Sequence, residues 1–80
     1  MFIIESTSKY GNKVYRVDRK KCPYRYWSSD ISKAYLYNKE EIATQECNHL
    51  KYGNPKVREI DAVDDIMITI GKTLNSVYEL

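Results

Sequence analysis

Two stretches near the amino terminus mix apolar and polar residues in the manner of half-buried strands. Residues 2–7 combine β-branched and aromatic side chains with polar ones, and residues 13–18 alternate apolar with charged side chains. Tyr10-Gly11-Asn12 lies between them, and both Gly and Asn tolerate positive φ at low steric cost. The pattern predicts a β-hairpin with its turn at residues 10–12.

The following segment is broken into short pieces. Pro23 cannot donate to a strand ladder, so its surroundings are expected to form a connection. Residues 24–27 are predicted to resume as an exposed strand or sheet edge. Ser28 to Asp30 supply capping side chains for one helical turn at about 31–33, and residues 34–37 are β-like.

A helix is predicted over about residues 39–52. Asn38 as N-cap and Glu41 three positions later resemble a capping box, and Gly53 suits the end of the helix. Four apolar residues recur at helical spacing and predict one buried stripe: Ile42, Ala43, Cys47 and Leu50.

In the last third of the chain, a returning strand is predicted over about 56–62. The apolar segment that follows fits either a helix or a strand. Residues 64–78 fit a helical stripe, yet 66–70 before Gly71 equally fit a buried strand, which we favour slightly. Together these elements predict an α+β fold in a single small domain over 1–80. A small antiparallel sheet of three to five strands packs against one main helix.

One four-residue sequence occurs twice. Lys-Tyr-Gly-Asn at residues 9–12 recurs at residues 51–54, and a segment containing Lys-Val follows each copy. We interpret the two copies as repeated use of one turn chemistry, because four matched residues are too few to indicate a duplicated domain.

The composition is typical of a chain that folds, and the charges are unevenly distributed along it. Of its 80 residues, 42% are hydrophobic and 30% charged, with a net charge of +2. Residues 1–39 carry nine cations and three anions, a net charge of +6, whereas residues 40–80 carry four cations and eight anions. No secretory signal or bilayer-spanning run is evident, so we expect a cytoplasmic protein that does not act at a membrane.

The chain lacks the motifs of an enzyme. No P-loop, dinucleotide fingerprint or nucleophile elbow is present, and Cys47 and His49 are two residues apart, on different faces of the predicted helix. Cys22 and Cys47 are expected to be reduced thiols. The acidic residues between 59 and 65 do not have the spacing of an EF-hand. We therefore expect no catalytic residue, no cofactor and no metal.

The most informative stretch, residues 9–27, interleaves cations with aromatic rings. Tyrosine gives large contact area with few rotors, and cations steer association with acidic groups. The candidate partner-binding residues are Arg16, Arg19, Lys20, Lys21, Tyr24, Arg25, Tyr26 and Trp27. The alternative interpretation is a hairpin without a binding role, whose basic face is solvated. In it, aromatic residues such as Tyr15, Tyr35 and Tyr37 fill the core.

Three motifs lie within residues 24–60: Tyr26-Trp27-Ser28-Ser29-Asp30, Lys33-Ala34-Tyr35-Leu36-Tyr37-Asn38 and Glu40-Glu41-Ile42-Ala43. With them, about half of the chain resembles small accessory proteins of phages and prophages of Gram-positive bacteria. The resemblance implies an aromatic strand and an Ala-aromatic strand leading into a helix on a curled sheet. It also implies a function as an inhibitor of host machinery, a class that includes anti-CRISPR proteins. Such inhibitors need no active site.

The sequence thus predicts a non-enzymatic binding protein of the host-cell cytoplasm. The leading hypothesis is an inhibitor or adaptor that docks on a host protein or nucleoprotein complex. The alternative is direct nucleic-acid binding through the basic and aromatic stripe of residues 13–27. A homodimer would follow if the apolar residues of 66–78 were left uncovered.

Overall fold

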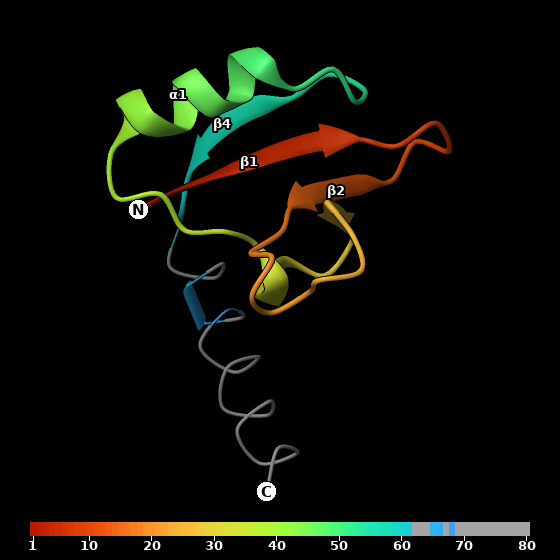
Figure 1. The fold of residues 1–80 in the computed structure, drawn as a ribbon, viewed down its shortest axis with the longest axis horizontal. Coiled ribbons are helices and arrows are strands. Elements are labelled where there is room, and N and C mark those ends of the chain that lie inside the picture. Colours follow the sequence, from red (N-terminus) through yellow and green to blue (C-terminus); the bar gives the residue numbers. More distant parts are fainter. Residues whose placement is uncertain (62–64, 67, 69–80) are drawn as a thin grey trace, which may run out of the picture.

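The computed structural model describes residues 1–61, 65, 66 and 68, which form a four-stranded antiparallel sheet with one α-helix (Figure 1). The strand order is β3-β2-β1-β4. The elements are β1 (Phe2–Thr7), β2 (Lys13–Arg16), β3 (Trp27–Ser28), the 3-10 turn η1 (Ile31–Lys33), α1 (Glu40–His49) and β4 (Lys56–Glu59). The predicted α+β class, with one main helix on a small antiparallel sheet, is confirmed.

β1 is a central strand because it pairs with a neighbour on each side. It forms the predicted hairpin with β2, in which Thr7 lies opposite Lys13, and it pairs with the returning strand β4, in which Ile4 lies opposite Val57. β3 is shorter than expected and begins at Trp27, not at Tyr24. β3 and β4 are therefore the two edges of the sheet.

The sheet has one face toward α1 and one face away from it. Residues opposite each other in an antiparallel pair share a face, and side chains alternate along a strand. The register therefore places Arg16 and Trp27 on the same face as Ile4, which packs against Ala43 of α1. Ile3, also fully buried, lies on the opposite face.

The described core on the helix face is small. Ile4, Tyr37 and Ala43 form a buried cluster, and five partly buried side chains pack around it: Phe2, Trp27, Cys47, Leu50 and Val57. Burying such side chains contributes about 25 cal/mol per Å² of apolar surface. This cluster fixes where α1 crosses the sheet.

The helix differs from its prediction at its start and on one face. Its N-cap is Lys39, without a side-chain cap, so the expected capping box of Asn38 and Glu41 is wrong. The reason is a long-range pairing: Phe2 and Tyr37 exchange two backbone hydrogen bonds of 2.8 Å, which hold the chain extended just before the helix. Ile42 was expected in the buried stripe but is 50% exposed, because it lies about 100° around the helix from Ala43.

The segment 34–37 does not form the expected strand. Only Ala34 and Tyr37 make bridges, to Val17 and Phe2 respectively, so the segment crosses the ends of two strands. The predicted helical turn at 31–33 is confirmed, with Asp30 as its side-chain cap.

Few residues of the ambiguous carboxyl-terminal segment are described. Ile66 and Ile68 are helical, so the slight preference for a strand there is wrong. The amide of Asp65 already donates to the carbonyl of Asp61, at 3.1 Å, in the i to i−4 pattern of a helix. The remainder of 64–78 lies outside the described residues.

Candidate docking surface

The connection between β2 and β3, residues 17–26, carries most of the candidate residues and is folded around Asp18. The Asp18 carbonyl accepts hydrogen bonds from the amides of Lys21 and Cys22, at 2.9 and 3.0 Å. Its carboxylate accepts another from the Lys20 amide at 2.9 Å. Side-chain bonds of this kind are typical of tight turns, so the basic run is held in a defined loop.

Two arginines lie against the ring of Tyr26. The guanidinium carbon of Arg19 is 4.0 Å from the ring centroid, and that of Arg16 is 5.0 Å from it. Arg19 also donates to the carbonyl of Pro23 at 2.7 Å. Each cation–π contact contributes about 0.5–1 kcal/mol at an exposed site. Tyr26 remains 57% exposed, so the three side chains form an ordered cluster that stays accessible.

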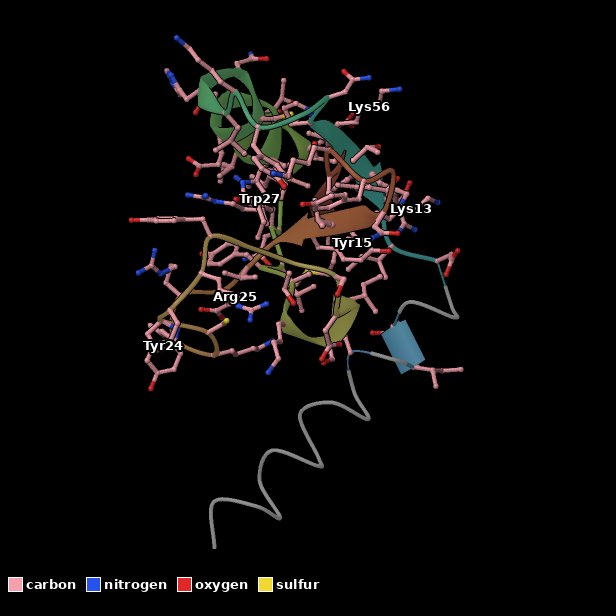
Figure 2. The ribbon with its side chains drawn as sticks, turned by 90° about the vertical axis from the view of Figure 1, so that its right-hand side faces the viewer. Lys13, Tyr15, Tyr24, Arg25, Trp27 and Lys56 are labelled. Atoms are coloured by element: carbon pink, nitrogen blue, oxygen red, sulfur yellow. The ribbon has the colours of Figure 1, made fainter. Side chains whose placement is uncertain are left out.

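Tyr24 and Arg25 form the exposed tip of this loop. Tyr24 is 92% exposed, and Arg25 is exposed as well. Figure 2 shows the Tyr24 side chain projecting from the loop, on the side away from Lys13 and Lys56. The tip therefore offers a ring and a cation that contribute little to the fold.

The two lysines of the run differ in their surroundings. Lys20 is exposed, whereas Lys21 is partly buried and its ammonium lies 3.5 Å from the carbonyl oxygen of Ser32. Lys20 is thus the more accessible of the two cations.

Trp27 belongs to the core more than to the loop surface. It packs against the cluster of Ile4, Tyr37 and Ala43, and its ring stacks on Tyr52 with centroids 5.4 Å apart. Its predicted role as a contact residue stays a prediction. Because the ring is partly buried beneath α1, replacing it would also disturb the packing.

A groove of about 390 Å³ lies between the loop and α1. Tyr35, Tyr37 and Ile42 supply its large apolar side chains. Arg16, Arg19 and Lys20 supply cations, while Asp18 and Glu46 supply carboxylates. Tyr35 is 43% exposed, so the expectation that it fills the core is wrong, whereas Tyr37 is buried as expected.

Buried and paired groups order the inner end of this groove. Arg16 of β2 lies 3.5 Å from the Glu46 carboxylate of α1. Burial, and then the charge of Glu46, raises the pKa of Tyr37 to about 12. The phenol is therefore neutral at physiological pH, and its ring lies tilted against Tyr35 with centroids 4.6 Å apart.

The structure separates Cys47 and His49 as the helical spacing predicts. Cys47 is partly buried against the core and His49 is exposed at the end of α1. Burial raises the pKa of the Cys47 thiol, which keeps it in its less reactive protonated form. Cys22 and Cys47 are both free thiols.

Sequence reasoning missed two contributors to the groove, Ile42 and Glu46. Both lie on the side of α1 that turns away from the Ala43 stripe, one helical turn apart. The spacing of Ala43, Cys47 and Leu50 alone defines a narrow stripe, and Ile42 falls beside it. The position of Ile42 beside this stripe was the sequence signal that its side chain would face the groove.

The chain matches no family model, and it shows no significant similarity to a curated protein or to a solved structure. Within the described part of the chain, no helix has the length and apolar content needed to cross a bilayer.

Proposed function

We propose that this protein is a non-enzymatic binding module that docks on another protein through the surface formed by the β2–β3 loop and the adjoining groove. The observation that carries the proposal is the position of Tyr26, in contact with two arginines beside a groove with exposed Tyr35 and Ile42. Tyrosine and arginine are the residue types that most often dominate binding energy at protein interfaces.

The surface combines an apolar centre with charged surroundings. Tyr35 and Ile42 are about half exposed. Arg19 and Lys20 have no acidic partner within the described residues, whereas Arg16 is paired with Glu46. A partner segment with apolar side chains flanked by carboxylates would complement this arrangement.

The partner class follows the resemblance stated for residues 24–60. We propose a host protein or nucleoprotein complex in the cytoplasm, bound as an inhibitor of the phage accessory type, anti-CRISPR proteins included. Such an inhibitor acts by occupying a surface, so it needs no catalytic residue, cofactor or metal.

Nucleic-acid binding through the stripe of residues 13–27 is the less favoured function. The sheet register divides this stripe between two faces, with Lys13 and Tyr15 away from α1 and Arg16 and Trp27 toward it. The two rings Tyr15 and Trp27 therefore lie on opposite faces of the sheet, and one nucleic-acid strand would not stack on both.

Affinity capture with matched variants tests the proposal. Tyr26→Ala and Ile42→Ala remove accessible rings and methyl groups from the surface, and Tyr10→Ala is the control because Tyr10 is 79% exposed and lies in the β1–β2 turn. We expect a protein captured by the wild type and by Tyr10→Ala to be lost with both other variants. With the purified partner, each loss should be about 30-fold or more in affinity, as for a hot-spot residue. Unchanged affinity of Tyr26→Ala and Ile42→Ala would remove this surface from consideration.

A further inference from the structure

A second basic surface lies at the end of the sheet where the two Lys-Tyr-Gly-Asn turns meet. The first copy connects β1 to β2, and the second lies between α1 and β4. Because β4 runs antiparallel to β1, its first residue is opposite Glu5, close to the end of β1. Both turns therefore lie at the same end of the molecule, at the right of Figure 1.

Two serines hold the turns in place. The Ser8 hydroxyl oxygen accepts hydrogen bonds from the amides of Tyr10 and Asn12, at 3.3 and 3.2 Å. The Ser6 hydroxyl accepts one from the Asn54 amide at 3.0 Å and donates to the Tyr52 carbonyl at 2.7 Å. The two turns are thus tied to neighbouring positions at the end of β1.

This end of the sheet concentrates positive charge. Segments 6–13 and 48–57 contain four lysines, all exposed, and no Asp or Glu: Lys9, Lys13, Lys51 and Lys56. Within the described residues none of the four has an ion-pair partner. The nearest carboxylate along β1, that of Glu5, is held by Arg58 at 2.9 Å. Lys13 and Lys56 lie on the face of the sheet away from α1, whereas Tyr52 lies against Trp27 on the α1 side. We call these four lysines, with Tyr10 and Tyr52, the turn-end surface, which extends around the end of the sheet.

Two aromatic rings accompany the lysines. Tyr10 is 79% exposed, with the Lys9 ammonium 5.1 Å from its centroid. Tyr52 is 44% exposed, and its ring is held against Trp27. Lysines neutralise phosphates, and exposed rings stack on unpaired bases, which gives affinity without sequence preference.

From this combination we infer that the turn-end surface binds the backbone and bases of single-stranded nucleic acid. An acidic protein segment would use the lysines but would leave the two rings without a stacking partner. Its lysines lie apart from the tip of the β2–β3 loop: Figure 2 shows Lys13 and Lys56 on the side opposite to Tyr24, whereas Tyr52 contacts Trp27. The inference therefore goes beyond the proposed function and does not depend on it.

Titration of the full chain with a labelled oligothymidylate at low salt tests this inference. We expect saturable binding that weakens with salt, with a log–log slope of about −2.8 if all four lysines contact phosphates. Emission of Trp27, the only tryptophan, should change on binding because Tyr52 stacks on it. No binding at low salt, or tighter binding to a duplex of equal length, would overturn the inference.

Variants identify the surface. Lys9→Gln combined with Lys51→Gln should weaken binding about tenfold or more at low salt and lower the magnitude of the slope by about 1.4. Tyr10→Ala should weaken binding without changing the slope. The matched control, Lys33→Gln combined with Lys39→Gln, removes two lysines outside both surfaces, one partly exposed and one exposed, and should retain most of the affinity. An equal loss in the control, or equally tight binding to polyglutamate or to anionic lipid vesicles, would contradict the inference.

Discussion

Ser6 and Ser8, two residues apart at the end of β1, each bind one of the two Tyr-Gly-Asn turns through the side-chain hydroxyl. Their environments differ. Ser6 is 2% exposed, whereas Ser8 is partly exposed and its bonds are at the surface. The same turn sequence is therefore attached once through a buried hydroxyl and once through a hydrated one.

Ser6→Ala should lower the free energy of unfolding by about 1–3 kcal/mol, because it leaves the Tyr52 carbonyl and the Asn54 amide without their buried partner. Ser8→Ala should cost only about 0.5 kcal/mol, since water can replace an exposed hydroxyl. Urea denaturation of both variants measures the difference. Equal costs would contradict the distinction between the two attachments.

The two turn glycines should also differ. Gly11 has φ of 83° and open space around it, so Gly11→Ala should cost about 1 kcal/mol, from left-handed strain alone. Gly53 has φ of 63°, and an added Cβ would collide with the Thr7 carbonyl oxygen and lie 2.6 Å from the Ser6 hydroxyl oxygen. Gly53→Ala should therefore cost roughly 3 kcal/mol or more in urea denaturation. A Gly53→Ala variant as stable as Gly11→Ala would show that the second turn does not need this close approach.

The first turn and the Asp30 cap were predictable from the sequence because their chemistry is local. Gly11-Asn12, held by Ser8, and the Asp30 cap at 31–33 depend on neighbours within a few residues, and both segments have the expected local character. The turn at 53–54 has the expected positive φ at Gly53, but it is held by the distant Ser6. The one misjudged detail is that Gly53 does not end α1. The helix ends at His49, its C-cap Leu50 is extended, and Gly53 instead serves the turn that leads to β4.

Two of the failures share a long-range cause. The pairing of Tyr37 with Phe2, across more than thirty residues, moved the helix start past Asn38 and prevented a continuous strand at 34–37. No local pattern contains that contact. For the site, composition identified the cations and rings of residues 16–27. Only the fold showed that Trp27 faces α1, and that Ile42 and Tyr35 join the groove.

Tyr37 should make stability depend on alkaline pH. Its folded-state pKa, raised to about 12 by burial, lies above the value of about 10 in the unfolded chain. Between these values the unfolded state releases the tyrosine proton more readily than the folded state does. The contribution of Tyr37 to the free energy of unfolding is therefore complete below pH 10 and decreases as pH rises toward 12. The free energy of unfolding should fall by about 1–3 kcal/mol over this pH range.

The comparison of wild type with Tyr37→Phe isolates this effect from lysines and other tyrosines that titrate in the same range. Urea denaturation at pH 9 and pH 11.5 should show a larger decrease for the wild type than for Tyr37→Phe. Absorbance at 295 nm should show one tyrosine fewer titrating late in the variant. Parallel decreases in both proteins would mean that Tyr37 is not buried as the structure describes.

Ile42 and Ala43 are adjacent in α1, yet the same replacement should destabilise the protein far more at Ala43 than at Ile42. Ile42 is 50% exposed at the groove, so Ile42→Gln should change the free energy of unfolding by no more than about 0.5 kcal/mol. Ala43 is fully buried against Ile4, so Ala43→Gln would place a larger polar group in the core and should cost about 3 kcal/mol. Urea denaturation of the two variants tests both values. If Ile42→Gln were as costly as Ala43→Gln, Ile42 would be part of the core, and the groove would lose the apolar residue that α1 presents to a partner.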